Sequence, residues 1–295
     1  MSIAVREIDR ALAFFLHHFP ARPDQPKRDG YDGSFRWADF TIGDFKIELI
    51  ESAQPGSFVD RFLAKRGEGL HHWSFDVDRL DPIVARLEAD GRRIVDRFDH
   101  GDGRKTAFVH PRSAFGTLIQ FWQTPEAERT RPSWGGIVEK HGTRWRADHL
   151  SIAVERLDPA VAFFRRHFGA VVETPRHLGY DQSFALLVLR VGEYRLELME
   201  SARRGSFLER FLARRGPAMH HLSIDVEDLD RATLPLERSG VQIVDRAELA
   251  AGWRTAFVHP RSAFGTLIQF WQTPATEWAR KGGDAGSAPA QKPTG

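Results

Sequence analysis

Short apolar segments with a period of two alternate along the chain with longer segments whose apolar residues recur at helical spacing. Leu150, Ile152 and Val154 are separated by polar or small residues, and this alternation predicts a half-buried strand. A helix follows, which we expect Asp158 to cap and Gly169 to end. The predicted apolar stripe of that helix consists of Leu157, Val161, Phe164 and Phe168.

The pattern after this helix predicts three more strands, so that the stretch has the order strand, helix and three strands. These strands are expected at 171–173, 184–191 and 194–199, with a hairpin turn at 192–193. The same βαβββ order is predicted for a following half-module, with strands at 221–226, 241–245, 255–259 and 265–271 and a helix at 229–239. A helix at 207–213 is expected to join the two half-modules.

The whole pattern occurs twice, because the chain is a tandem duplication with an offset of 149 residues. The twenty residues Thr106–Pro125 are identical to Thr255–Pro274. The predicted organisation is two domains at 1–125 and 148–274, a linker at 126–147 and a disordered low-complexity tail at 275–295.

Each copy contains a fainter repeat with an offset of 72 residues. The ten residues that begin at His149 match those that begin at His221 at eight positions. The chain is therefore predicted to be an α+β protein of four βαβββ modules, paired in two domains. Because helices cover one face of each sheet, we expect two curved sheets to enclose a cleft lined by the other face, which carries both histidines.

Composition and charge limit the classes of function. Hydrophobic residues make up 41% and charged residues 28% of the 295 residues, as in a folded globular protein. Lys and Arg number 42 against 40 Asp and Glu, and this net charge of +2 gives no basis for nucleic-acid binding. The absence of cysteine excludes disulfides and Cys-ligated metals. Without a transmembrane-length apolar run or a signal peptide, we expect a cytoplasmic protein with no membrane partner.

The nested repeat places four potential metal ligands at related positions. His149 and His221 lie on the predicted first strands of two half-modules. Glu197 and Gln269, again 72 residues apart, lie near the ends of the last strands. Two imidazoles, one carboxylate and one amide oxygen can hold a six-coordinate divalent metal ion and leave positions open for a substrate. The alternative is that each is an ordinary polar residue of the fold, which makes their symmetric placement a coincidence.

The first copy carries a second set of candidate ligands, Glu48, His72 and Gln120. The position that corresponds to His149 falls just before Met1, so this set lacks its fourth member. Two interpretations are open: either the second site is degenerate and structural, or the natural start lies upstream of Met1. The three retained ligands and the identical twenty-residue segment favour the upstream start.

These motifs resemble those of the vicinal-oxygen-chelate superfamily, which includes glyoxalase I, methylmalonyl-CoA epimerase, extradiol dioxygenases and bleomycin-resistance proteins. The segments that carry the resemblance are Asp148–Val154, Arg195–Glu200, Phe62–His72 and Phe257–Gln269. The resemblance covers both copies and is strongest to methylmalonyl-CoA epimerase. It implies paired βαβββ modules and a divalent metal ion (Co, Mn, Ni, Zn or Fe(II)), with ligands His149, Glu197, His221 and Gln269.

The chain departs from the family pattern in the position of the acid. The last-strand ligand is usually Glu in metal-dependent members, whereas here it is Gln269. The earlier position, often Gln in the epimerases, is Glu197. The carboxylate has thus changed places, which leaves the identity of the catalytic base open. Glu197 is the first candidate for metal ligand and base, and Asp225, on the same strand face as His221, is the second.

Two of the candidate residues, Trp271 and Asp225, can instead have a purely structural role. Trp271 lies on the same strand face as Gln269, where it can pack against a substrate or equally against the core. Asp225 can be a polar residue at the open end of the cleft.

Three classes of function remain, each with a small-molecule partner. The first is an isomerase or lyase that acts through a metal-stabilised enolate on an acyl-CoA or α-oxo substrate, as epimerases and glyoxalases do. The second is an Fe(II)-dependent ring-cleaving or α-keto-acid dioxygenase, favoured by two His and one carboxylate but opposed by the placement of Glu197. The third is a non-catalytic binding protein of the resistance type, opposed by the retained ligands. The two copies are expected to pair as an intramolecular pseudo-dimer, and a homo-oligomer is also open.

Overall fold

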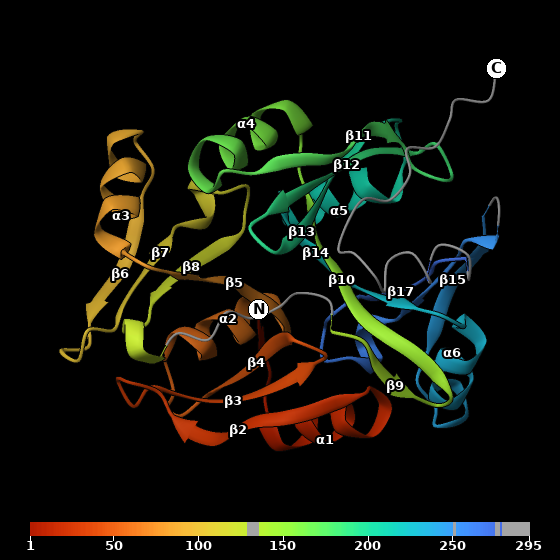
Figure 1. Cartoon of the computed structure of the whole chain (residues 1–295), viewed down its shortest axis with the longest axis horizontal. Coiled ribbons are helices and arrows are strands. Elements are labelled where there is room, and N and C mark those ends of the chain that lie inside the picture. Colours follow the sequence, from red (N-terminus) through yellow and green to blue (C-terminus); the bar gives the residue numbers. More distant parts are fainter. Residues whose placement is uncertain (129–135, 250–251, 275–277, 279–295) are drawn as a thin grey trace. The chain divides into compact units, whose positions relative to one another are not determined.

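The computed structural model describes residues 1–128, 136–249, 252–274 and Trp278 (Figure 1). These residues form two compact units. Unit 1 comprises residues 1–72, 136–148, 221–274 and Trp278, and unit 2 comprises residues 73–128 and 149–220. Each unit therefore contains one half-module from each copy of the repeat. Apart from Trp278, the tail expected to be disordered lies outside the described residues, and the expected domain boundaries stay a prediction.

The first copy consists of two half-modules linked by a helix. Its elements are β1 (Ser2–Ala4), α1 (Ile8–His18), β2 (Ala21–Asp29), β3 (Phe35–Ile42), β4 (Phe45–Ser52), α2 (Phe58–Arg66), β5 (Gly69–Val77), α3 (Leu80–Ala89), β6 (Ile94–Asp99), β7 (Lys105–Val109), the 3-10 turn η1 (Pro111–Ser113), β8 (Leu118–Gln123) and η2 (Glu126–Glu128).

The second copy repeats this order after a short additional strand. Its elements are β9 (Val138–Lys140), β10 (Thr143–Ala153), α4 (Leu157–Phe168), β11 (Val171–Leu178), β12 (Phe184–Val191), β13 (Tyr194–Ser201), α5 (Phe207–Arg215), β14 (Ala218–Val226), α6 (Leu229–Arg238), β15 (Ile243–Glu248), β16 (Arg254–Val258), η4 (Pro260–Ser262) and β17 (Ile268–Gln272).

Each copy forms one continuous sheet. The strand order is β2-β3-β4-β1-β5-β8-β7-β6 in the first and β11-β12-β13-β10-β14-β17-β16-β15 in the second. In each half-module the first strand runs parallel to the last, as β10 does to β13 and β14 to β17. The predicted βαβββ order and α+β class are confirmed. The half-modules join edge to edge instead of as two facing sheets, because their first strands, such as β1 and β5, pair with each other.

Strand β10 begins at Thr143, inside the segment expected to be a linker, and β9 pairs with it. Thr143, Trp145 and Ala147 are buried and alternate with Arg144 and Arg146. This alternation is a strand pattern, which the Arg- and Trp-rich composition of the segment obscured. The extension brings the two arginines into unit 1.

The module helices are capped by side chains from the last strand of the same half-module. The donor and acceptor pairs, each 43 residues apart, are Ile8–Glu51, Leu80–Gln123, Leu157–Glu200 and Leu229–Gln272, with N···O distances of 2.7 or 2.8 Å. The expected capping of α4 by Asp158 is therefore wrong, since Arg156 is the N-cap residue and Asp158 lies in the first turn. Gly169 ends α4 in the left-handed conformation (φ 62°), as predicted.

The buried stripe of α4 differs slightly from the predicted one, because Val161 and Phe168 are only half-buried. Its buried side chains are Leu157, Ala160, Phe163, Phe164 and His167. No helix of the described residues is long and apolar enough to cross a membrane.

Aromatic residues fill the interior of each unit. In unit 1, Trp145 is fully buried, with its ring centroid 6.0 Å from that of Phe19 and 5.3 Å from that of Phe270. In unit 2, the rings of Phe75 and Phe168 lie 5.4 Å apart. Because buried aromatic rings remove large apolar areas from water, these contacts account for much of the packing between half-modules within a unit.

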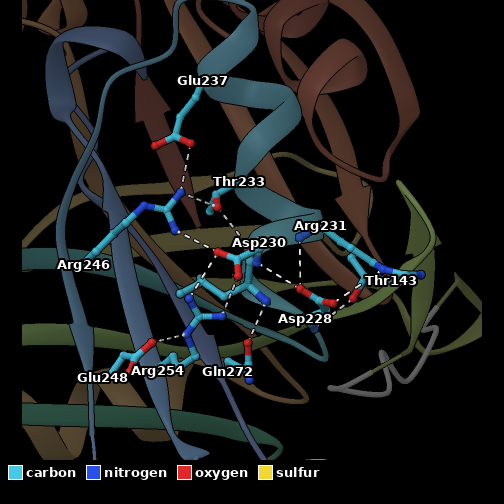
Figure 2. A network of polar contacts seen from close by, with 11 residues as sticks. Thr143, Asp228, Asp230, Arg231, Thr233, Glu237, Arg246, Glu248, Arg254 and Gln272 are labelled. Carbon is cyan, nitrogen blue, oxygen red and sulfur yellow. Dashed lines mark hydrogen bonds and ion pairs between the residues drawn. The ribbon is translucent and has the colours of Figure 1, made fainter.

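A polar network ties α6 to the outer strands of unit 1 (Figure 2). The side chain of Asp228 caps the helix by accepting hydrogen bonds from the backbone N–H groups of Asp230 and Arg231. The Asp230 carboxylate lies between two guanidiniums, 2.8 Å from Arg254 and 3.4 Å from Arg246. The first turn of α6 is thus fixed both by its cap and by charge.

Candidate metal centre

His149 and Glu197 lie on neighbouring parallel strands of unit 2, β10 and β13. Ser151 and Glu197 are register partners, and the Ser151 hydroxyl donates a 2.9 Å hydrogen bond to Oε1 of Glu197. Nε2 of His149 lies 3.8 Å from Oε2 of Glu197, and the two side chains are only 8% and 12% exposed. The strands thus present one imidazole nitrogen and one carboxylate oxygen at a nearly buried position.

His221 and Gln269 lie in the equivalent relationship in unit 1, on β14 and β17. Ser223 and Gln269 are register partners, and both ligand candidates are buried. Nε2 of Gln269 donates a 3.2 Å hydrogen bond to the hydroxyl of Thr255, whose own hydrogen goes to the carbonyl of Phe270. This arrangement makes the amide oxygen the atom of Gln269 that can bind a metal. The sequence patterns did not indicate this role of Thr255.

The structure brings three of the four predicted ligands together. The four strands that carry them are consecutive in the sheet, in the order β13-β10-β14-β17. One ligand atom from each of His149, Glu197 and His221 lies within 4.8 Å of the other two. Imidazole and carboxylate ligands suit a divalent ion such as Zn, Mn, Co, Ni or Fe(II).

The fourth candidate passes a test that does not depend on the resemblance. The Gln269 amide oxygen is buried and has no hydrogen-bond partner among the residues that the structure describes. Buried acceptors are normally satisfied, and a divalent cation would satisfy this one. The donor set therefore fits a metal ion.

Only the second histidine of each adjacent pair is a predicted ligand. The ring of His220 packs against Phe211, 4.8 Å between centroids, and against Phe207 of α5. Burial lowers the pKa of His220 to about 4, with a further contribution from Arg215, so His220 is neutral at pH 7. Because successive side chains of a strand point to opposite faces, His221 lies on the other face from these aromatic rings.

The first copy keeps part of the same geometry. In unit 1, Nε2 of His72 lies 3.5 Å from Oε2 of Glu48, and Ser2 is the register partner of Glu48. Burial, followed by the nearby carboxylate of Asp39, raises the pKa of Glu48 to about 7.

Gln120, in unit 2, differs from its repeat partner Gln269. Its amide oxygen accepts a 2.7 Å hydrogen bond from the hydroxyl of Ser74. The corresponding oxygen of Gln269 makes no such bond within the described part of the chain. The amide of the first copy is therefore already satisfied by its own neighbour.

Asp225, the second candidate base, is fully buried within unit 1 and ion-paired with Arg146. Its Oδ1 also accepts a 2.8 Å hydrogen bond from the Thr273 hydroxyl. The guanidinium of Arg146 in turn lies 4.9 Å from the ring centre of Trp278. Both oxygens of the Asp225 carboxylate are therefore already bound by side chains of unit 1.

Trp271, the candidate substrate contact, is half-buried on β17. Its ring packs against Trp253, 5.4 Å between centroids. One side of the Trp271 indole therefore packs against another side chain of the protein.

Residues 1–108 and 148–257 match the family described as Glyoxalase/Bleomycin resistance protein/Dioxygenase superfamily. The two matched segments correspond to the two copies of the repeat. The chain is 30% identical over 132 residues to the ethylmalonyl-CoA/methylmalonyl-CoA epimerase of Cereibacter sphaeroides, covering 43% of this chain and 97% of that protein. It is 27% identical over 137 residues to the human mitochondrial methylmalonyl-CoA epimerase, covering 44% of this chain and 77% of that protein.

Two further similarities are weaker or shorter. An uncharacterised protein of Bacillus subtilis, YqjC, is 38% identical over 85 residues, and the match spans 28% of this chain and 61% of that protein. The crystal structure of methylmalonyl-CoA epimerase from Mycobacterium tuberculosis aligns with a TM-score of 0.41 and 28% identity, over 52% of this chain and 97% of that one.

Proposed function

The chain belongs to the Glyoxalase/Bleomycin resistance protein/Dioxygenase superfamily, and we propose that it is a divalent-metal-dependent enzyme of the isomerase or lyase type. Its substrate is a small acyl-CoA or α-oxo compound that loses a proton next to a carbonyl. The observation that carries the proposal is the group of His149, Glu197 and His221. Gln269 is the fourth ligand, supported by its buried amide oxygen.

The names of the relatives support an acyl-CoA as the class of substrate, but they do not identify the particular acyl-CoA. Two of them are named for epimerisation of methylmalonyl-CoA, and each matches about half of this chain. The second copy holds all four ligand positions, so we place the catalytic centre there. The first copy is a structural partner, because its Gln120 is already hydrogen-bonded to Ser74.

A divalent metal, when bound, supplies Lewis-acid stabilisation of negative charge on a carbonyl oxygen. Glu197 accepts the proton from the adjacent carbon and returns it. The hydrogen bond that Ser151 donates to Oε1 of Glu197 holds this carboxylate in place for the transfer. Asp225 is assigned a positioning role, because Arg146 and Thr273 already bind its carboxylate. The exposed side of Trp271 contacts the substrate.

A dioxygenase is the second candidate, favoured by one observation. Two histidines and one carboxylate form the close group, which is the ligand set of Fe(II) oxygenases. The family description also includes dioxygenases. This alternative requires iron and dioxygen, whereas the isomerase proposal requires neither.

One pair of assays separates the two candidates. The full chain loaded with Co, Mn, Ni, Zn or Fe(II) is incubated with methylmalonyl-CoA in D₂O, and exchange at the carbon next to the thioester is followed by NMR. The same protein with Fe(II) is tested for dioxygen uptake with a catechol. We expect the wild-type chain to catalyse this exchange. Glu197→Gln should abolish the exchange, whereas His72→Ala, in the first copy, should leave it intact. Dioxygen uptake without exchange would establish the alternative.

A further inference from the structure

A pocket of about 310 Å³ lies within unit 1 between α1 and the turn that joins α6 to β15, and none of the candidate ligands lines it. Its charged and titratable lining residues are Arg10, His18, Glu68 and Arg261. Ser239 and Phe264 line it as well. The proposed reaction assigns no role to this pocket.

Unit 2 contains the repeat-related junction, which allows a direct comparison. In unit 1 the rings of Phe14 and Phe264 lie 5.6 Å apart in an edge-to-face arrangement. In unit 2 the corresponding rings of Phe163 and Phe115 also lie 5.6 Å apart and edge to face. The histidine one turn further along each helix keeps its place too, at 4.8 Å from Phe14 and 5.0 Å from Phe163. The two junctions thus share one aromatic frame.

The carboxylate of Asp90 at the unit 2 junction has no counterpart at the same position of the unit 1 junction. In unit 2, Asp90 accepts hydrogen bonds of 2.5 and 2.6 Å from the guanidinium of Arg166. Its Oδ2 also lies 3.5 Å from Nε2 of His167. The residue that corresponds to Asp90 in unit 1 is Ser239, which has no charge. The equivalent of His167, His18, is retained.

The two arginines that line the unit 1 pocket outnumber its one carboxylate, Glu68. Neither Arg10 nor Arg261 makes an ion pair among the described residues; Arg10 lies over the ring of Phe264 at 6.0 Å. Glu68, the carboxylate of the lining, accepts a 2.8 Å hydrogen bond from the backbone N–H of Arg6 and forms no ion pair there. Arg10 has no counterpart at the other junction, where the corresponding residue is Pro159.

Basic groups surround His18 at the edge of this pocket. Burial lowers the pKa of His18, and His17, Lys140 and His141 lower it further by their charge. Nζ of Lys140 binds the carbonyls of Leu16 and Phe19, at 2.9 and 2.7 Å, at the C-terminal end of α1. These carbonyls are therefore satisfied and do not repel an anion in the pocket.

We propose that this pocket binds a small oxyanion from solution, in the place that the Asp90 carboxylate takes at the other junction. Arg10 and Arg261 supply charge-assisted hydrogen bonds, and His18 faces the same ligand. The shared chemistry is that of a phosphate or carboxylate group. The inference does not depend on the proposed reaction.

The test uses inorganic phosphate and, separately, acetate, with the full metal-free chain at constant ionic strength. The imidazole signals of His18 are followed by NMR, and binding is measured by calorimetry. We expect phosphate to raise the pKa of His18, because a bound anion stabilises the imidazolium. Ser239→Asp returns a carboxylate to the junction, and we expect it to weaken phosphate binding at least about tenfold and to raise the pKa of His18 without added anion.

A matched pair of arginine variants completes the test. Arg261→Ala should weaken phosphate binding at least about tenfold. Arg112 is the repeat partner of Arg261 at the unit 2 junction, and Arg112→Ala should not change phosphate binding. Acetate binding without phosphate binding would restrict the ligand to carboxylates. The proposal is overturned if neither anion shifts the His18 signals at tens of millimolar, or if Ser239→Asp binds both anions as tightly as the wild-type chain.

Discussion

Nε2 of Gln269 donates a hydrogen bond to the buried hydroxyl of Thr255 over 3.2 Å, and this contact determines which end of the amide is available to a metal. Thr255 lies on β16, next to β17, and is fully buried. Thr255, which is not itself a proposed metal ligand, thus orients one.

Removal of this hydroxyl should weaken metal binding without unfolding the protein. In Thr255→Val the amide of Gln269 loses its anchor, and we expect a loss of about tenfold to a hundredfold in metal affinity, as for other residues that orient ligands. Thr255→Ser should restore most of the affinity. Competition with a chelating dye measures the effect. Equal loss in Thr106→Val, the same change in the first copy, would contradict the assignment.

The side-chain caps on the module helices should contribute measurable stability. Glu200→Ala removes the acceptor for the backbone N–H of Leu157, so we expect the free energy of unfolding to fall by about 1 to 2 kcal/mol. Urea denaturation followed by circular dichroism provides the measurement. Glu193→Ala, at an exposed hairpin turn, is the control and should change stability by less than about 0.5 kcal/mol. Identical urea denaturation curves for Glu200→Ala and Glu193→Ala would show that this cap does not stabilise the protein.

The ion pairs around Asp230 should make part of the stability depend on pH. Hydrogen bonding from Arg254, with the charge of Arg246, holds the pKa of this carboxyl below its usual value of 3.8. A group with a lowered pKa in the folded state stabilises the protein above its ordinary pKa, and this stabilisation is lost as the pH falls through the lowered value. Asp230→Asn should therefore be less stable than the wild-type chain near neutral pH, and the difference should shrink below about pH 4.

The first copy offers the matched control for this effect. Asp81 occupies the equivalent position and pairs with Lys105 at 2.8 Å, which also lowers its pKa. Lysine binds through one atom, whereas Arg254 binds both oxygens of Asp230. We expect the smaller loss in Asp81→Asn. A pH-independent difference for both variants would show that the charges have no part in it.

Glu197 should be separable from the other ligands by its effect on turnover. Glu197→Gln keeps an oxygen ligand but removes the proton acceptor, so kcat should fall by at least about a hundredfold while a divalent metal is still bound. Ser151→Ala, which frees Oε1, should lower kcat less. The deuterium-exchange rate and the metal content of the same samples test both statements. Retained exchange in Glu197→Gln would assign the base elsewhere.

Much of the fold follows from two kinds of pattern in the sequence. The period of two in Leu150 to Val154 and the repeat offset of 149 residues predict four βαβββ modules, and these are confirmed. The start of β10 at Thr143 was missed because its alternation lies in an Arg-rich stretch that resembles a linker. Capping of α4 by Glu200 was missed because the acceptor is 43 residues away, whereas familiar capping motifs are local.

The candidate ligands could be predicted from the repeat in the sequence. The contacts that depend on residues brought together by the fold could not. The offset of 72 residues relates His149 to His221 and Glu197 to Gln269. The ion pair between Asp225 and Arg146 joins residues 79 positions apart, and no spacing in the sequence indicates it.

The central claim is that the second copy holds a divalent metal, and metal analysis of two matched variants tests it most directly. His221→Ala removes a proposed ligand, and His72→Ala makes the same change at the repeat-related position. After loading and removal of excess ion, we expect the wild-type chain and His72→Ala to retain the same amount of divalent metal and His221→Ala to retain none. Metal retained equally by His221→Ala, or a wild-type chain that binds no divalent ion, would contradict the account.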